Sequence, residues 1–330
     1  ILADIKGAGA IVRIWSAQPK TGHVKIFIDG EAEPALDMPF INYFGGGFPF
    51  NLNSMAYESG RGMNCYVPIT YSSSCRVVAY DDWGRYFHIG YISYPENTSV
   101  EPFSLPLSAD GQRALLAADR RFSGEPGAAA DAYDGKTTAE KTVTVPAGGK
   151  TELLNTSGAG AVVGITARLN GLENEGDDWE ALAALAVSAK WDSEQTSSVF
   201  TTLGGFFGSI CGVNEYSGLP LGVKADGTMY ADWYMPYSDG ALLTLQNDGD
   251  RDYSVTYSVS TVSLDKSEAD GLLRFHAKWT RLKDPGKSSD RWPDSEFLNI
   301  KGTSGRFVGT SLHVYKQIGT GDPDYNPDWW

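Results

Sequence analysis

The sequence predicts an all-β protein made of two tandem jelly-roll β-sandwiches that arose by internal duplication. Its 38 glycines, 16 prolines and 12% aromatic residues are typical of many short strands joined by tight turns. Short sequence blocks also occur twice in the same order, and polar and apolar residues alternate over most other segments. A chain of 330 residues is long enough for two such domains.

The repeat defines the domain organisation. Five blocks recur with an offset that grows along the chain from 151 to 168 residues: 7–14 with 158–165, 24–31 with 187–194, 43–45 with 206–208, 51–54 with 214–217, and 64–68 with 232–236. We therefore expect a first jelly-roll module at 1–125, a linker or excursion at 126–155, and a second module at 156–330.

Alternation and propensity predict the individual elements. One helix is expected over 109–122, where Ser108 caps a segment whose Leu115 and Leu116 share a face. Residues 179–191 are rich in alanine, but their counterpart in the first module alternates as a strand does, so we expect a strand at least from Ala184 onward. Further strands are expected at 75–80, 86–91, 142–145, 253–262, 273–279 and 307–315.

Charge and motif content exclude several function classes. A net charge of −14 disfavours nucleic acid and anionic membranes as partners, and no apolar run approaches the length of a membrane span. The three cysteines lack metal-ligand spacing, and a Cys65–Cys75 bridge stays open. The glycine-containing segments 7–9, 135–137 and 149–151 lack the further glycine that a nucleotide-binding loop needs, so we expect neither a metal nor a cofactor. Calcium-like acidic runs at 248–252 and 322–328 lack the glycine and the glutamate of an EF-hand, which favours acidic turns.

Aromatic, amide and carboxylate residues recur at matching places in the two modules, which is how proteins hold sugars. For most of these residues a structural role stays open, and for Phe44 and Phe207 it is favoured. A histidine within 273–279 could point into a pocket or simply be hydrogen-bonded in a strand. The residues predicted to bind carbohydrate are Asn64, Tyr66, Asp232, Trp233 and His276.

The blocks at 4–15, 28–31, 43–45, 64–68, 226–229, 234–237 and 275–279 resemble glycoside hydrolase family 172, the difructose-dianhydride hydrolases and α-D-fructofuranosidases/arabinofuranosidases. The resemblance runs in the family's order from Asp4 to Trp330. It implies a tandem jelly roll, a carbohydrate ligand, a homo-oligomer of trimers or their multiples with active sites where protomers meet, and a retaining mechanism with two glutamates.

The chain departs from the family at those glutamates. The Trp-Gly-Glu-Gly-Asp-Glu and Gly-Thr-Glu-Asp-Tyr segments that carry them, which follow the stretch like 309–315, are absent from the sequence. No catalytic residue is therefore assigned, and we expect no activity from this chain alone. Asp29 and Glu31 are spaced like a catalytic pair, but acidic turn residues are the favoured interpretation.

Two functions remain open. The chain is either part of a family-172-like hydrolase of fructofuranosyl or arabinofuranosyl glycans, or a non-catalytic double jelly roll that assembles like a viral shell or surface layer or binds sugar. Secreted, periplasmic and cytoplasmic locations all fit the sequence.

Overall fold

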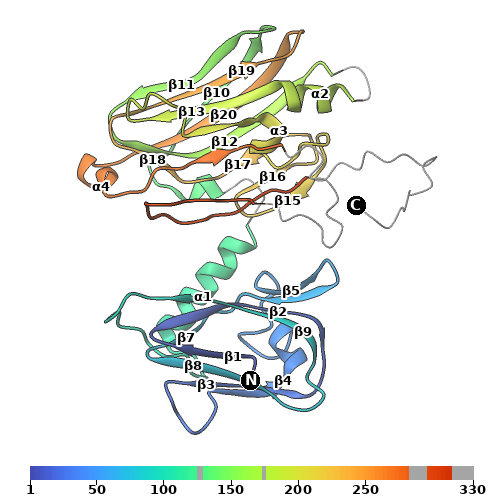
Figure 1. The fold of residues 1–330 in the computed structure, drawn as a ribbon, viewed down its shortest axis with the longest axis vertical. Helices are drawn as coiled ribbons and strands as arrows, with labels where there is room; N and C mark the ends of the chain where they lie inside the picture. The colour runs from blue at the N-terminus through green and yellow to red at the C-terminus, as the bar shows by residue number, and fades with distance from the viewer. Residues whose placement is uncertain (125–128, 173–175, 282–295, 314–330) are drawn as a thin grey trace, which may run out of the picture. The chain divides into compact units, whose positions relative to one another are not determined.

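The computed structural model describes residues 1–124, 129–172, 176–281 and 296–313. The chain divides into two compact units, Ile1–Gly124 and Glu125–Trp330, and each unit is a β-sandwich with its own apolar core (Figure 1). The predicted all-β architecture of two tandem sandwiches is therefore confirmed. None of the helices in the described part of the chain combines the length and hydropathy that crossing a bilayer requires.

The first sandwich consists of two antiparallel sheets that enclose the core. One sheet has the order β1 (Ala3–Lys6), β8 (Ser74–Ala79), β3 (His23–Ile28) and β4 (Leu36–Pro39). The other has the order β5 (Ala56–Ser59), β6 (Gly62–Cys65), β2 (Gly9–Pro19) and β7 (Ile69–Tyr71), with β9 (Gly84–Ser93) also paired to β2. The helical turn η1 (Phe40–Phe44) contributes buried aromatic side chains to the core, and helix α1 (Ala109–Phe122) follows the last strand.

The second sandwich repeats this plan. Its first sheet has the order β11 (Lys150–Ser157), β19 (Gly240–Asn247), β13 (Leu185–Trp191), β14 (Val199–Thr202) and β21 (Ala277–Lys278). Its second sheet has the order β10 (Thr137–Val145), β20 (Tyr253–Ser263), β12 (Gly160–Asn170), β17 (Met229–Ala231), β16 (Leu221–Val223) and β15 (Tyr216–Ser217), with β18 (Met235–Tyr237) on β12. The helices are η2 (Ala129–Ala132), α2 (Asp177–Ala184), α3 (Leu203–Phe206) and α4 (Lys266–Asp270).

The two sandwiches share strand order and irregularities. In each, the long strand (β2 or β12) pairs with the strand at the end of the repeat (β9 or β20), and successive strands cross between sheets as in a jelly roll. The pairing register of β2 shifts between Ile11 and Arg13, and that of β12 shifts between Val162 and Gly164. A β-bulge at the same place in both copies is the mark of one duplicated module.

The structure corrects the alignment of the last repeat block. Cys65 pairs with Ile14 in the first sandwich, whereas Ala231 pairs with the equivalent Ile165 in the second. The structural offset is thus 166 residues, whereas the sequence match of 64–68 with 232–236 gives 168. Asp232 is therefore the counterpart of Tyr66 and not of Asn64.

Several local predictions are confirmed. Helix α1 spans Ala109–Phe122, and the Ser108 side chain accepts a hydrogen bond from the Gly111 N–H as a cap does. Strand β13 begins at Leu185, directly after α2, so the alanine-rich run is a helix followed by the predicted strand. Phe44 and Phe207 are buried in their cores.

In other places the structure differs from what the sequence suggested. The range 126–155, expected to be a linker or excursion, contains β10 and most of β11. Of the strand predicted over 273–279 only Ala277–Lys278 pairs, and 307–313 forms no strand, while 314–315 lie outside the described residues. Cys65 and Cys75 are free thiols on strands of different sheets, so they do not face each other across a hairpin.

Candidate functional site

A row of polar and aromatic side chains crosses the outer face of the sheet that contains β5, β6, β2 and β9. Tyr57 lies opposite Asn64, Asn64 opposite Trp15, and Trp15 opposite His88, so the four residues form one rung across four strands. The adjacent residue on β2, Ile14, is buried in the core. Because neighbouring side chains of a strand point to opposite sides, the rung lies on the face away from the core.

Arg13 and Tyr66 continue this face beside the rung. The Arg13 Nη2 donates a hydrogen bond of 2.9 Å to Asn64 Oδ1, and the Asn64 Nδ2 donates one of 3.3 Å to the carbonyl oxygen of Gly62. The Arg13 guanidinium lies 5.9 Å from the centre of the Tyr66 ring, which is stacked 6.0 Å from the ring of Tyr57. Asn64 is only 6% exposed, so its amide fixes the position of Arg13.

The other end of the rung is also aromatic. The rings of Trp15 and His88 stack with their centres 4.9 Å apart, and the indole lies so close to Gly62 that a Cβ there would be 2.3 Å from its nitrogen. Tyr57 is 36% exposed and His88 is exposed. We call the following six residues the aromatic face: Arg13, Trp15, Tyr57, Asn64, Tyr66 and His88.

The aromatic face has the chemistry of a carbohydrate platform. Ring surfaces suit the apolar faces of a sugar, while the histidine, the phenol groups and the guanidinium suit its hydroxyl groups. Partial burial and the neighbouring Tyr66 raise the pKa of Tyr57, so its hydroxyl keeps its proton at neutral pH. The buried Arg13 Nε has no hydrogen-bond partner among the described residues.

The equivalent face of the second sandwich has lost these groups and is covered by the chain itself. The counterparts of Arg13, Trp15, Tyr57, Asn64, Tyr66 and His88 are, in that order, Gly164, Thr166, Gly222, Tyr230, Asp232 and Ser258. The Ala129 N–H at the start of η2 donates a hydrogen bond of 3.2 Å to Asp232 Oδ2, and Tyr133 stacks on Tyr234 at 5.7 Å. Burial raises the pKa of Asp232. This carboxyl anchors η2 over its own sheet.

The five predicted binding residues thus fall in different places. Asn64 and Tyr66 are brought together by Arg13 in the first unit. Trp233 packs against the second core with its ring 5.5 Å from that of Phe275, and His276 is exposed beyond that residue. Asp232 bonds η2 and Trp233 contacts Phe275, so these two predicted residues are engaged by other parts of the second unit.

Sequence reasoning missed four members of the aromatic face. Arg13 and Trp15 are two residues apart on a predicted strand whose Ile14 is apolar, so the alternation alone would have placed both on the outer side. Tyr57 and His88 carry no such signal, because only strand pairing brings them to the same rung.

Asp29, one of the carboxylates that resembled a catalytic pair, holds a turn. Its oxygens accept backbone hydrogen bonds from Ser72 at 2.9 Å, Ser73 at 2.6 Å and Ser74 at 3.1 Å. Partial burial acts to raise the pKa of Asp29, but the hydrogen bonds from these serines outweigh it and lower the pKa to about 2. A carboxylate whose oxygens are occupied in this way is poorly placed to attack a sugar.

Asp192 does the same in the second sandwich. It accepts backbone hydrogen bonds from Ser238 at 2.6 Å and Asp239 at 2.8 Å, and the Arg274 Nε donates to it at 2.5 Å. Partial burial opposes the shift, yet the Asp239, Arg274 and Ser238 hydrogen bonds keep the pKa of Asp192 below its usual value. The turn interpretation of these repeated acidic residues is thus supported by their contacts.

The hydrogen bonds that Asp29 accepts in its turn predict that the stability of the protein depends on pH. Its pKa is lower in the folded state than in the unfolded state, so its contribution is present above about pH 4 and is lost as the pH falls toward 2. Between about pH 5 and 2, the free energy of unfolding of the wild type should fall by about 1–2 kcal/mol more than that of Asp29→Asn, a range that allows for solvent screening. Urea titrations at several pH values measure this. Asp81→Asn, at an exposed turn position, serves as control and should follow the wild type. If the free energy of unfolding of Asp29→Asn depends on pH as steeply as that of the wild type, the stabilising role of the Asp29 hydrogen bonds is contradicted.

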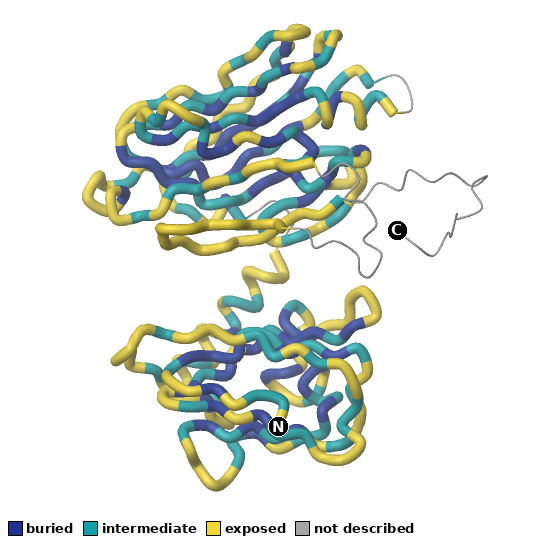
Figure 2. Tube along the Cα trace, viewed as in Figure 1, coloured by how far each residue is buried: buried dark blue, intermediate teal, exposed yellow. Residues whose placement is uncertain are grey.

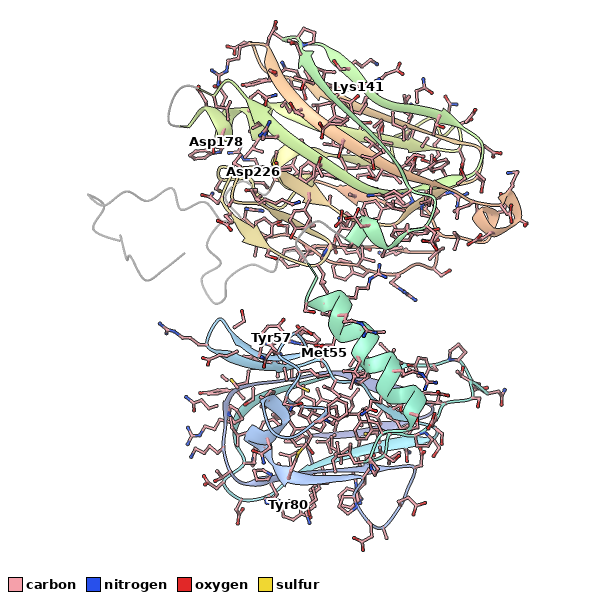
Figure 3. The ribbon with its side chains drawn as sticks, turned by 180° about the vertical axis from the view of Figure 1, so that it is seen from behind. Met55, Tyr57, Tyr80, Lys141, Asp178 and Asp226 are labelled. Atoms are coloured by element: carbon pink, nitrogen blue, oxygen red, sulfur yellow. The ribbon has the colours of Figure 1, made fainter. Side chains whose placement is uncertain are left out.

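A cavity of about 430 Å³ on the second sandwich is a weaker candidate. It lies between the end of β12, the start of α2 and the turn before β17, where Asp178 and Asp226 face one region (Figure 3). Asp178 accepts the Val213 N–H at 2.7 Å and Asp226 accepts the Thr228 N–H at 2.9 Å, so both carboxylates hold backbone. Among the described residues, the cavity lining contains no aromatic side chain to stack on a sugar.

The described residues also offer no metal centre. No group of three or more His, Cys, Asp or Glu side chains in this part of the chain is placed to hold an ion. Within the acidic run 248–252, Asp252 accepts the Ala147 N–H at 2.9 Å and so holds a turn. The run at 322–328 lies outside the described residues.

Comparison with known proteins identifies the family. The model described as GH172 first beta-sandwich domain matches residues 1–110, and the one described as GH172 domain-like matches residues 135–259. Comparison with curated protein sequences gives no match.

Two virus proteins are among the similar solved structures. The VP2 subviral particle of infectious bursal disease virus is 8% identical, with 82% of this chain and 60% of that chain covered and a TM-score of 0.23. The STIV MCP is 11% identical, with 82% and 94% covered and a TM-score of 0.23. The chain therefore spans less than two thirds of the VP2 chain, and likeness at this level carries no argument about function.

The two family matches cover most of the chain, and each falls on one of its sandwiches. The chain belongs to glycoside hydrolase family 172.

Proposed function

We propose that this chain binds fructofuranosyl or arabinofuranosyl glycans on the aromatic face of its first sandwich, as the double-sandwich part of a family-172 glycoside hydrolase. Membership of the family supports a carbohydrate ligand. The observation that carries the proposal is the rung of Tyr57, Asn64, Trp15 and His88, which presents aromatic and hydrogen-bonding groups on one outer face.

In this proposal the sugar ring lies against the Tyr57 and Tyr66 rings. The Arg13 guanidinium and the phenol hydroxyl groups then donate hydrogen bonds to ring and hydroxyl oxygens. Asn64 is a positioning residue, because its buried amide holds Arg13 over the Tyr66 ring. Bound sugar would displace water from ring surfaces that are already ordered by stacking, which limits the entropic cost of binding.

The chain alone would bind without turnover. Retaining hydrolysis needs two carboxyl groups about 5–5.5 Å apart, and Asp29 and Asp192 are already engaged in holding turns. The proposal assigns the role of neither catalytic glutamate of the family to a residue of this chain. The alternative, a non-catalytic assembly protein, requires no saturable sugar binding. The sugar titration described next distinguishes it from the proposal.

Truncating Tyr57 tests the proposal. We expect Tyr57→Ala to weaken binding of an arabinofuranosyl oligosaccharide by about 3–10-fold, because one ring contact contributes about 0.5–1.5 kcal/mol. Isothermal titration calorimetry on the full chain provides the dissociation constant.

The matched control is Tyr80→Ala. Tyr80 is 48% exposed on the opposite sheet of the same sandwich (Figure 3). The variant therefore removes a similar ring from a face to which the proposal assigns no sugar. It should bind like the wild type. Equal weakening by the two variants, or no binding by the wild type, would refute the aromatic face as the binding surface.

A further inference from the structure

Strand β9 of the first sandwich has a neighbour on one side only. It pairs with β2, and no other strand of the described residues pairs with it. Its counterpart in the second sandwich, β20, pairs with β12 on one side and with β10 on the other (Figure 1). Among the described residues, the first sandwich therefore has no strand in the position that β10 takes in the second, and the outer edge of β9 is open.

The open edge changes how far the two strands are buried. Seven of the eleven residues of β20 are buried, whereas none of the ten residues of β9 is (Figure 2). Strand pairing makes Phe87 the counterpart of Tyr257 and Ile89 the counterpart of Val259. Tyr257 and Val259 are 3% and 2% exposed, but Phe87 and Ile89 are only partly buried. The core-facing side of the first sandwich is thus incompletely covered at this edge.

Strand β10 shows what covers the equivalent edge in the second sandwich. It runs antiparallel to β20, with Ala139 opposite Val259, and Val145 on the same side of β10 is fully buried in the core. The residues between them lie on the outer side, where the Thr138 hydroxyl is 2.9 Å from that of Ser260. A strand with small or apolar side chains facing inward and hydroxyl groups facing outward therefore fits this position.

Strand β9 also lacks the features that protect exposed edges. It is the longest edge strand of the described residues, and Arg85 is its only residue with a formal charge. Its Tyr86, Tyr91 and Ile92 side chains are 44–63% exposed. Tyr86 has a left-handed backbone conformation, with a φ of 56°, so the regular part of the edge is 87–93. An extended edge with so little charge is a ready template for a further strand.

We propose that the edge at 87–93 binds an extended segment of a partner polypeptide, which adds antiparallel to β9 as β10 adds to β20. The described residues offer no spare strand for this position, because each of their strands of seven residues or more already belongs to a sheet. Backbone hydrogen bonds would hold the segment, and its alternate side chains would decide which segment binds. This proposal goes beyond sugar binding and does not depend on it.

The register of β10 defines the chemistry of the segment. Lys141 and Ala139 lie opposite Tyr257 and Val259, so the matching positions of the bound segment lie opposite Phe87 and Ile89. Because these two side chains are left partly uncovered, both positions should be apolar. The positions between them face the outer side and should be small and polar, as Thr138 is in β10.

A labelled nine-residue peptide tests the proposal. It has the sequence of residues 137–145 with Ala139→Val and Lys141→Val, which give it apolar side chains at both core-facing positions. We expect saturable binding to the full chain at one site, measured by fluorescence anisotropy. Hydrogen–deuterium exchange of the complex should show new amide protection within 87–93 and none in β4, a short edge strand of the opposite sheet.

Two sets of control peptides distinguish strand addition from unspecific apolar contact. The peptide with Ala139→Asp and Lys141→Asp should bind at least tenfold more weakly, because charged groups replace the apolar ones. The successive amides of a strand face opposite edges, and N-methylation removes the hydrogen that an amide donates. Methylation of one alternate set of amides in the valine peptide should therefore abolish binding, and methylation of the other set should be tolerated.

Several results would overturn the proposal. One is a valine peptide that does not bind, and another is amide protection in β4 or β20 in place of 87–93. Equal binding of the valine and aspartate peptides, or an equal effect of the two methylated sets, would exclude strand addition as the mode of binding. A sugar titration of the same chain is a separate measurement, so a failure of this proposal is told apart from a failure of the proposed function.

Discussion

Trp191→Ala should destabilise the second sandwich by about 3–5 kcal/mol, the largest effect expected of any single substitution considered for this chain. The Trp191 side chain is fully buried in the core between the sheets. Its Nε1 donates a hydrogen bond of 2.7 Å to the carbonyl oxygen of Phe275, and its ring stacks parallel to that of Tyr237 with centres 6.5 Å apart. Alanine leaves both a cavity and an unpaired carbonyl oxygen.

Urea unfolding followed by tryptophan fluorescence and circular dichroism measures this loss. Trp279→Ala is the matched control, since that side chain is 45% exposed and its removal should change the free energy of unfolding by about 0.5 kcal/mol or less. If the two tryptophan variants unfold at the same urea concentration, the core described for the second sandwich is wrong.

Gly9→Ala and Gly160→Ala should each destabilise their own sandwich by about 1–3 kcal/mol or more, because the added methyl groups have no space. A Cβ at Gly9 would lie 2.3 Å from the carbonyl oxygen of Ile92 and 2.6 Å from the Tyr71 hydroxyl. A Cβ at Gly160 would meet the counterparts of the same groups, the Val262 carbonyl oxygen at 2.6 Å and the Tyr237 hydroxyl at 2.7 Å. The backbone oxygens cannot move aside without breaking strand pairing.

Thermal unfolding of both variants checks the duplication as well as the packing. Gly47→Ala is the control, since a Cβ there meets nothing within 4 Å, and it should be neutral or slightly stabilising. Two equivalent glycines with losses of similar size would be expected of one module used twice. A loss at one position and tolerance at the other would show that the starts of β2 and β12 pack differently.

The fold could be predicted from the sequence because the duplication supplies two views of one module. An alanine-rich segment is ambiguous by propensity, yet the alternating counterpart of Leu185–Trp191 in the first module identifies it as a strand. Helix α1 was predictable for a local reason, since Ser108 caps it and Leu115 faces the core. In both cases local preference and tertiary burial agree.

The register of the last block could not be settled by sequence. The match of 64–68 to 232–236 rests on shared Tyr and Pro residues, whereas strand pairing aligns Cys65 with Ala231. The error of two residues keeps every side chain on the same face of the strand, so the alternation pattern gives no warning. The error did pair Asn64 with Asp232, and the prediction that Asp232 binds carbohydrate followed from that pairing.

The covering of the second face was also beyond sequence reasoning. Segment η2 lies outside the repeated blocks, so nothing in the first module hints that Ala129 would bond Asp232. Alternation misled at 273–279 and 307–313, because a strand needs an edge to pair with. Only Ala277–Lys278 reaches one, on β14.

A titration that compares Tyr66→Ala with Trp233→Ala tests the central claim most directly. Both residues were predicted from the sequence to bind carbohydrate, but only Tyr66 lies on the aromatic face. With an arabinofuranosyl oligosaccharide and the full chain, we predict one site per chain, binding that is at least several-fold weaker in Tyr66→Ala, and wild-type binding in Trp233→Ala. Binding that survives Tyr66→Ala and is lost in Trp233→Ala would contradict the assignment of sugar recognition to the first sandwich.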